Sequence, residues 1–227
     1  MESVGYKRKK QDYFTEEAFK SLRTNLQFCG KDKKVIAITS CIPNEGKSTV
    51  SFSLAISLAE FGKKVLFIDA DLRRSVLAGR IKVNGQVKGL THYLSRQASL
   101  QEVICKVDDV TNLHIVIAGP VSPNPTELLG GEAFKDLITV ARQVYDYVII
   151  DTPPLGSVID SVVVAGNCDG AILVIESGSI SYRFAQNITK QLEKSNCAIL
   201  GAILNKVDLA SKNKYGKYGK YYKQEYA

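Results

Sequence analysis

The sequence has no apolar run approaching the roughly 18 residues that span a bilayer. Its first ten residues, MESVGYKRKK, are basic but are not followed by the apolar stretch of a secretory signal. These absences predict a protein that neither crosses a membrane nor is secreted through a cleavable signal. With 227 residues, 45% of them apolar, the chain is long enough to bury one good core.

Disulfide and metal-binding patterns are missing as well. The five cysteines are odd in number and widely spaced, and no C-x-x-C pair occurs. This argues against a disulfide framework or a zinc site and favours reduced thiols in a cytosol. The two histidines, His92 and His114, lie far apart, so packing or surface roles suit them better than metal ligation.

Basic charge is concentrated at the two ends of the chain, whose net charge is +7. Residues 1–34 hold nine Lys/Arg and five Asp/Glu, residues 206–227 hold six and two, and the middle holds fifteen and sixteen. Basic ends suit solvated arms, an anionic membrane surface or an acidic protein. No RNA-binding motif or recognition helix accompanies the charge, so nucleic acid is not an expected partner.

The C-terminal segment KYGKYGKYYKQEYA combines five tyrosines with four lysines and has neither helical nor strand periodicity. Such a segment predicts a mobile, solvated terminus. A purely solubilising tail would use Ser, Glu or Lys instead of Tyr, so the tyrosines need another purpose. They are Tyr215, Tyr218, Tyr221, Tyr222 and Tyr226.

From residue 35 onward, short apolar runs alternate with helical patterns. The runs are VIAIT, KVLFI, LHIVIA, YVIID, GAILVIE and AILGAILN, and the helical patterns cover 47–61, 75–80, 90–105, 131–144, 158–166 and 181–194. Continuous apolar strands separated by helices predict an α/β fold, a doubly wound and mostly parallel sheet covered on both faces.

An amphipathic helix is predicted over residues 15–28, where Phe19, Leu22 and Leu26 recur at helical spacing. We expect this helix to precede the core. The predicted division is therefore a basic arm with its helix over 1–34, a core domain over 35–206 and a flexible tyrosine-rich tail over 207–227.

The first predicted strand runs directly into SCIPNEGKST, whose last residues open a helix. A phosphate-binding loop needs successive backbone N–H groups around an anion at the positive end of a helix. Gly46 would permit close approach, Lys47 would reach the β- and γ-phosphates, and Ser48 would ligate Mg²⁺. The pattern G-x-x-x-x-G-K-[ST] is not fully met, because Cys41 replaces its first glycine. The flanking strand and helix nevertheless favour a P-loop of deviant Walker type.

Carboxylates stand at the ends of two predicted strands. The segment FIDADLRR places Asp69 and Asp71 two residues apart in extended chain, so both project to the same side. The strand YVIID ends in Asp151, at the position of a Walker B acid that orients Mg²⁺. Ligands of open α/β sheets bind beyond the carboxyl ends of the strands. Each acid alone would pass as a solvated strand end, but three beside a phosphate loop predict a metal–nucleotide site.

The segments PNEGKST, VLFIDADLRRS, GPVSPNPTELL and VIIDTPP, together with the tyrosine-rich C-terminus, resemble the bacterial tyrosine kinases. That family uses a Walker-type P-loop NTPase fold, and the resemblance covers about residues 15–227. It implies Mg-ATP-dependent phosphorylation of tyrosines, including the protein's own tail, and control of capsule or exopolysaccharide synthesis.

The chain is also similar to the split form of this family. In that form a separate transmembrane protein of polysaccharide export activates a cytoplasmic kinase and recruits it to the inner face of the cell membrane. The family's self-association pattern, Glu then Arg then Arg at three-residue steps, appears here as Glu17, Lys20 and Arg23. The resemblance thus implies a ring-like oligomer, with one arginine of the pattern replaced by lysine.

Charge placement assigns the roles in the site, because phosphoryl transfer needs positioning and charge neutralisation more than covalent chemistry. We assign Lys47 to the transferring phosphate and Asp69 to the tyrosine proton. Mg²⁺ is assigned to Ser48, Asp71 and Asp151. The predicted ATP-binding residues are Pro43, Asn44, Glu45, Gly46, Lys47, Ser48, Thr49 and Asn205, the last near the adenine.

Three other functions compete with this interpretation. A partition or septum-placement ATPase shares GKST and IDAD but carries a second lysine in a K-G-G-x-G-K loop, where this chain has Pro43, Asn44 and Glu45. An iron–sulfur carrier with the same core would need paired cysteines. A non-catalytic ATP-binding adaptor stays open.

Overall fold

The computed structural model of the protein describes residues 2–6, 12–83 and 87–208. The five tail tyrosines lie outside these residues. The strands are β1 Ser3–Tyr6, β2 Val35–Ser40, β3 Val65–Asp69, β4 Ile81–Val83, β5 Cys105–Val107, β6 Leu113–Val116, β7 Tyr147–Asp151, β8 Gly170–Glu176 and β9 Ala198–Asn205. The helices are α1 Tyr13–Phe28, α2 Lys47–Glu60, α3 Leu90–Leu94, α4 Leu100–Val103, α5 Pro125–Gly130, α6 Glu132–Val144, α7 Asp160–Ala165 and α8 Tyr182–Glu193, with a 3₁₀ turn, η1, at Leu77–Gly79.

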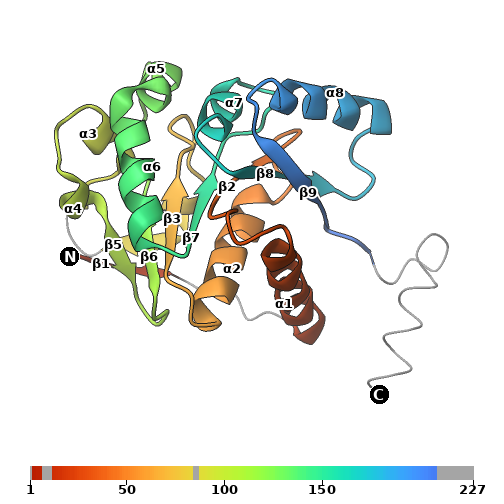
Figure 1. Ribbon diagram of the computed structural model, residues 1–227, viewed down its shortest axis with the longest axis horizontal. Coiled ribbons are helices and arrows are strands. Elements are labelled where there is room, and N and C mark those ends of the chain that lie inside the picture. Colours follow the sequence, from red (N-terminus) through yellow and green to blue (C-terminus); the bar gives the residue numbers. More distant parts are fainter. Residues whose placement is uncertain (1, 7–11, 84–86, 209–227) are drawn as a thin grey trace.

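The strands of the described chain form one sheet in the order β4-β1-β5-β6-β3-β7-β2-β8-β9. Pairing is parallel from β6 across to β9, whereas β1–β4 and β5–β6 are antiparallel. Helices lie on both faces of the sheet (Figure 1). The predicted doubly wound α/β fold with a mostly parallel sheet is therefore confirmed.

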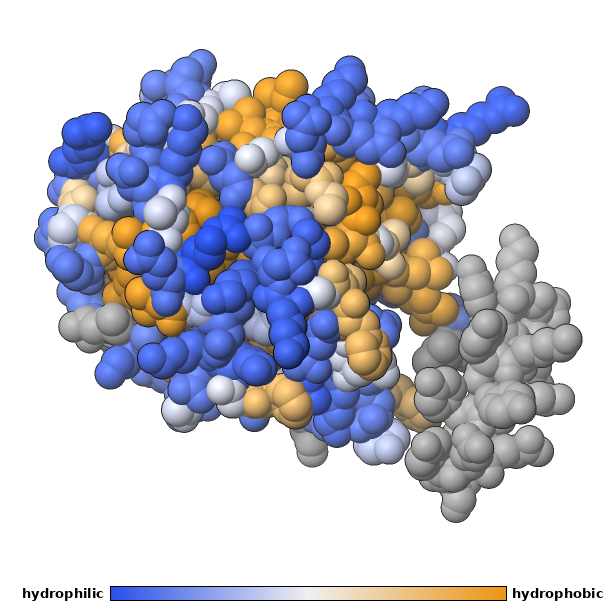
Figure 2. Space-filling view, in the orientation of Figure 1, coloured by the Kyte–Doolittle hydropathy of each residue, from blue (hydrophilic) through white to orange (hydrophobic). Residues whose placement is uncertain are grey.

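Each inner strand buries both of its faces, as a continuous apolar run requires. In β2, Val35 and Ala37 pack into the core below α3, α5, α6, α7 and α8, while Ile36 and Ile38 pack into the core against α2. On the second face Phe52 of α2 meets Phe67 of β3 edge to face, with ring centroids 5.0 Å apart. Polar side chains cover most of the surface in Figure 2, and apolar patches interrupt them.

The structure differs from the sequence-based expectation mainly at one edge of the sheet. Residues Ser3–Tyr6 form β1 inside the sheet, although we expected the N-terminal segment to precede the core. The pattern over 90–105 yields α3 and α4, and β5 begins at Cys105. Ser99 and Glu102 form a capping box that starts α4 as a new helix. Strands of three or four residues are too short to leave a periodic signal.

The helix prediction at 75–80 was also too long. Only the 3₁₀ turn Leu77–Gly79 forms there. The predicted packing roles of the histidines agree with their contacts: His92 Nδ1 accepts from the Gly89 amide, and His114 Nδ1 lies 2.8 Å from the Tyr145 hydroxyl oxygen. The five cysteines are free thiols.

The order of the central strands determines where the site lies. Strand β7 lies between β3 and β2, in a register that pairs Asp151 with Asp69 on one side and with Ile38 on the other. The ends of β3 and β7 and the loop after β2 therefore meet at one edge of the sheet. The described part of the chain contains no helix long and apolar enough to cross a membrane.

Candidate active site

The loop between β2 and α2 adopts the conformation that a phosphate-binding loop requires. Asn44 has φ 68° and Gly46, the N-cap of α2, has φ 88°. The φ of Gly46 favours glycine, and a Cβ there would also displace the Asn205 side chain, whose Nδ2 lies in its place. Positive φ does not occur at Cys41, whose side chain is buried in the core. The missing first glycine of the pattern is therefore not needed for this backbone.

The backbone amides of this loop are available to an anion. Within the described residues, the amides of residues 44–48 donate to no protein acceptor, while the Ile42 amide donates to Glu45 Oε2 at 2.8 Å. Two of the available amides belong to Lys47 and Ser48 in the first turn of the 14-residue helix α2. Unpaired amides at a helix N-terminus provide partial positive charge, so the loop fits the phosphates of a nucleotide.

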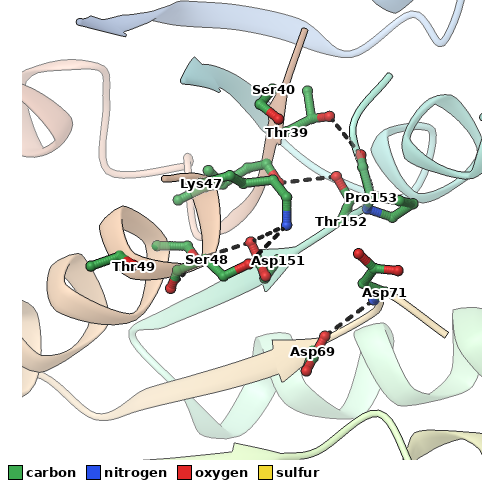
Figure 3. A network of polar contacts seen from close by, with 12 residues as sticks. Thr39, Ser40, Lys47, Ser48, Thr49, Asp69, Asp71, Asp151, Thr152 and Pro153 are labelled. Carbon is green, nitrogen blue, oxygen red and sulfur yellow. Dashed lines mark hydrogen bonds and ion pairs between the residues drawn. The ribbon is translucent and has the colours of Figure 1, made fainter. Parts of the chain in front are cut away.

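Lys47 and Asp151 form a buried ion pair at the centre of the site (Figure 3). Lys47 Nζ lies 2.9 Å from Asp151 Oδ1 and 3.1 Å from Ser48 Oγ. The side chains of Lys47 and Asp151 are only 7% and 2% exposed. Ser51, one turn after Lys47, donates to the same carboxylate oxygen at 3.0 Å. The predicted residues Lys47, Ser48 and Asp151 are thus brought together.

Asp69 and Asp71 lie beside this pair, at the end of β3 (Figure 3). The Asp71 amide donates to Asp69 Oδ1 at 3.2 Å, and the Ser75 hydroxyl donates to Asp69 Oδ2 at 2.5 Å. Asp71 accepts the Arg74 amide at 2.9 Å. Both carboxylates are buried. Among the described residues no three His, Cys, Asp or Glu side chains are grouped so that they could hold a metal unaided. A cation here would need Ser48 or a ligand's phosphates as well.

The Asp69 carboxyl has a raised pKa. Burial, followed by the negative charge of Asp151, raises the pKa of Asp69 to about 7, against the opposing effects of Ser75 and Lys47. A carboxyl group without a direct cationic partner loses hydration on burial, which disfavours its charged form. Asp69 therefore exchanges its proton near neutral pH.

The side chain of Glu45 makes contacts within the protein. Its carboxylate accepts from the Ile42 amide, the Glu176 amide at 3.2 Å and the Ser179 hydroxyl at 3.3 Å. Asn205 Nδ2 donates to the Glu45 carbonyl at 2.9 Å. Only the backbone amide of Glu45 is free for a phosphate, while its side chain ties the loop to the end of β8.

The structure adds supporting residues that sequence reasoning missed. Ser51 and Ser75 hold Asp151 and Asp69, and Lys206 Nζ binds the Asn44 carbonyl at 2.7 Å and Glu176 Oε2 at 2.8 Å. The spacing of Ser51, four residues after Lys47, could have been used to find it. Lys206 and Glu176 have no local signal, because their contacts join distant parts of the chain.

The predicted self-association residues lie apart from this site, on α1. Glu17 and Lys20 form an exposed ion pair of 2.6 Å on one turn. Arg23 instead reaches its own domain: Nη1 lies 3.1 Å from the Ser57 carbonyl oxygen, and the guanidinium carbon lies 4.2 Å from the Phe61 ring centroid. Arg23 therefore holds α1 onto α2 within one chain.

Comparison with known proteins agrees with this geometry. A family profile described as "AAA domain" matches residues 33–200. The chain is 48% identical over 208 residues to tyrosine-protein kinase CpsD of Streptococcus agalactiae, covering 91% of this chain and 90% of the relative. It is 36% identical to the succinoglycan biosynthesis transport protein ExoP of Rhizobium meliloti, covering 88% of this chain but 27% of ExoP.

A solved structure, the kinase domain of the Escherichia coli tyrosine kinase ETK, superposes with a TM-score of 0.82 at 35% identity, covering 88% of this chain and 78% of that one. Fold, phosphate loop and sequence similarity over most of the length thus agree. The chain belongs to the AAA-domain family of bacterial tyrosine-protein kinases that includes CpsD.

Proposed function

We propose that the protein is a Mg-ATP-dependent protein-tyrosine kinase that phosphorylates its own C-terminal tyrosine cluster and regulates capsule or exopolysaccharide synthesis. The observation that carries the proposal is the buried group of Lys47, Asp69, Asp71 and Asp151 beside a loop of free amides. We assign to this group an anion site, a cation site completed by Ser48 and a titratable acid, the three elements that tyrosine phosphorylation needs.

The loop amides of residues 44–48 and Lys47 would hold the phosphates of ATP. Ser48, Asp71 and Asp151 would hold Mg²⁺, since hydroxyl and carboxylate oxygens are the ligands this hard cation prefers. Bound Mg-ATP supplies the phosphoryl group and the charge that offsets its negative oxygens. Lys47 would exchange its contact with Asp151 for one with phosphate.

Asp69 is the proposed acceptor of the tyrosine proton. Its pKa of about 7 matches the pH at which a cytosolic enzyme works. Because Asp69 is buried, water is kept from hydrogen-bonding to its carboxylate in place of the tyrosine hydroxyl. The ordinary pKa of tyrosine, about 10, makes such an acceptor useful for orienting and polarising the hydroxyl.

Asn205 is the proposed neighbour of the adenine. Its side chain lies against the phosphate loop, because Nδ2 donates to the Glu45 carbonyl at 2.9 Å. Pro43 and Asn44 would contribute to the loop's shape, because Asn44 supplies one of its two positive φ angles.

The tail tyrosines Tyr215, Tyr218, Tyr221, Tyr222 and Tyr226 are the proposed substrates, along with tyrosines of other proteins. A transmembrane activator of polysaccharide export is the proposed partner, recruiting the kinase to the inner membrane face. In support of it, this chain matches only about a quarter of ExoP, so in that relative the matching part belongs to a longer protein. Self-association into a ring, through the face carrying Glu17, Lys20 and Arg23, completes the proposal.

The experiment that tests the proposal is a phosphotyrosine blot of the purified protein with ATP and Mg²⁺, with the activator's cytoplasmic segment added in a parallel sample. A signal that disappears in Lys47→Met is expected. A partition-type ATPase would release phosphate without phosphotyrosine, and an adaptor would bind ATP with neither product. Either of these results would replace the kinase proposal.

A further inference from the structure

Three loops at the carboxyl edge of the sheet meet at one buried carboxylate, Asp160. Arg73, from the loop after β3, donates to it twice: Nε lies 2.7 Å from Oδ2 and Nη2 lies 3.0 Å from Oδ1. Thr126, from the start of α5, donates to Oδ1 at 2.7 Å and accepts from Arg73 Nη2 at 3.2 Å. Asp160 itself opens α7, after β7. We call Arg73, Thr126 and Asp160 the loop clamp.

The clamp is built like a site that must hold one geometry. The Asp160 side chain is 0% exposed, while that of Arg73 is 40% exposed, so the arginine reaches inward from the surface. Burial alone would raise the pKa of Asp160, but the hydrogen bonds from Arg73 and Thr126 outweigh it and hold this pKa below its usual range. A bidentate arginine–carboxylate pair restricts distance and orientation together.

The clamped segments adjoin the acids of the site. Arg73 follows Asp71 by two residues. Between them, the Leu72 carbonyl accepts from the Ser122 amide at 3.2 Å, which ties this loop to the segment before α5. Asp160 follows Asp151 on the same connection from β7 to α7. Strand pairing places Asp151 opposite Asp69, and the Ala70 amide donates to the Asp151 carbonyl at 2.8 Å. Beyond Ala70 the chain that carries Asp71 leaves the sheet, and the clamp is a direct ionic link from this segment to the connection after β7.

We infer that the loop clamp of Arg73, Thr126 and Asp160 is a positioning device, which holds Asp71 at the spacing from Asp151 that one Mg²⁺ ion requires. This inference rests on the proposed function, because it assumes that these two acids face the metal. None of the three clamp residues is among those proposed to hold the metal or the nucleotide. Partners that orient metal ligands from behind typically change metal affinity or activity by about 10- to 100-fold when they are removed.

A purely structural pair would behave differently, and the chain contains a matched example. Arg142 and Asp169 form another partly exposed arginine–aspartate pair, with Nη1 2.6 Å from Oδ1 and side-chain exposures of 38% and 18%. Asp169 accepts the amides that begin β2, so this pair lies at the opposite edge of the sheet from the site. Arg142→Met removes a comparable ion pair without disturbing either acid-bearing loop.

The test compares Arg73→Met, Arg73→Lys and Thr126→Val with Arg142→Met, all in the full-length chain. The main measurement is the affinity for a fluorescent ADP analogue in EDTA and then in saturating Mg²⁺; the ratio of the two affinities is the metal-dependent gain. We expect Arg73→Met to lower this gain by about tenfold and to leave the affinity in EDTA within about twofold of the unmutated protein's. Arg73→Lys keeps the charge but loses the second hydrogen bond. Its metal-dependent gain should therefore fall between that of Arg73→Met and that of the unmutated protein.

Arg142→Met should lower the melting temperature and leave the metal-dependent gain unchanged. Thr126→Val, which removes one hydroxyl and keeps the shape, supplies a milder variant should Arg73→Met fold poorly. An unchanged gain in both Arg73→Met and Thr126→Val would overturn the clamp while leaving the kinase proposal intact. No gain in the unmutated protein would overturn the metal site and the clamp together, whereas the phosphotyrosine blot tests the kinase proposal separately.

Discussion

Nζ of Lys47 lies 2.9 Å from Oδ1 of Asp151, and both side chains are almost completely buried. The first residue of α2 and the last residue of β7 thus neutralise each other at the centre of the site. Removing one partner of a buried ion pair leaves an uncompensated charge, which is costly. The lysine proposed to bind phosphate therefore also stabilises the fold.

Replacing Lys47 by methionine should affect stability, nucleotide binding and catalysis together. We expect no phosphotyrosine, weaker ATP binding by calorimetry, and a free energy of unfolding lower by about 3 kcal/mol, because Asp151 would keep only the hydrogen bond from Ser51. Lys135→Met is the control, since it removes an exposed pair with Glu132 that is worth about 1 kcal/mol at most. Normal phosphotyrosine in Lys47→Met would remove this lysine from the mechanism.

Asp69→Asn should abolish phosphorylation but leave ATP binding intact, because Asp69 is assigned to the tyrosine and not to the nucleotide. Its pKa of about 7 also predicts a stability effect. The folded state holds the Asp69 proton up to about pH 7, whereas the unfolded chain releases it near the ordinary value of 3.8. The carboxyl therefore stabilises the fold at low pH, and this contribution is lost as the pH rises through about 7.

In EDTA, Asp69→Asn should accordingly raise the free energy of unfolding at pH 8 relative to the unmutated protein, and do so less at pH 5. The effect of the substitution at pH 8 should exceed its effect at pH 5 by on the order of 2 kcal/mol, since one unit of raised pKa corresponds to about 1.4 kcal/mol. Urea titrations at the two pH values measure it, with the exposed Asp136→Asn as control. An equal effect at both values would contradict the raised pKa.

The two ends of the α1 pattern should respond differently to mutation. Glu17 is partly exposed, and its ion-pair partner among the described residues is Lys20, so Glu17→Ala should reduce the particle size in light scattering without changing the melting temperature. Arg23→Ala should lower the melting temperature as well, because Arg23 holds α1 to α2 through Ser57 and Phe61. If neither variant changes the particle mass, α1 serves packing within one chain and not self-association.

The tail should be a substrate delivered to a neighbouring subunit. Residues 206–227 carry a charge of +4, which favours their approach to the carboxylates of the site. Each phosphate adds about −1.5 to −2, so five would reverse the tail's sign and drive it away, loosening an assembly that it holds together. The chain from residue 206 spans on the order of 70 Å when extended, enough to reach its own site or another.

Mixing two variants distinguishes these routes. Lys47→Met protein with an intact tail is combined with active protein whose five tail tyrosines are phenylalanine. Phosphotyrosine should appear on the inactive partner, and light scattering should show the assembly shrinking as it accumulates. A blank blot, with the unmutated enzyme active under the same conditions, would leave only reaction within one chain or no tail substrate.

Much of the site could be predicted from the sequence, because each part has a local signature. A buried strand appears as an apolar run, a helix start as Gly46-Lys47-Ser48, and a strand end as the acid that terminates the run, Asp69 or Asp151. These signals depend on backbone hydrogen bonding and side-chain periodicity over a few residues, which neighbours in sequence control. The fold class and the phosphate loop followed from them, and so did the two acid-bearing strand ends.

How these parts face one another depends on contacts between distant segments of the chain. The position of β7 between β3 and β2 sets Asp151 beside Lys47, and this order results from long-range strand pairing that no local pattern encodes. The same applies to Glu45, whose carboxylate accepts a hydrogen bond from the Glu176 amide, and to Arg73, which pairs with Asp160, 87 residues away in the sequence. A buried charge must find its partner wherever the fold places one, so such pairings depend on the packed chain and not on sequence spacing.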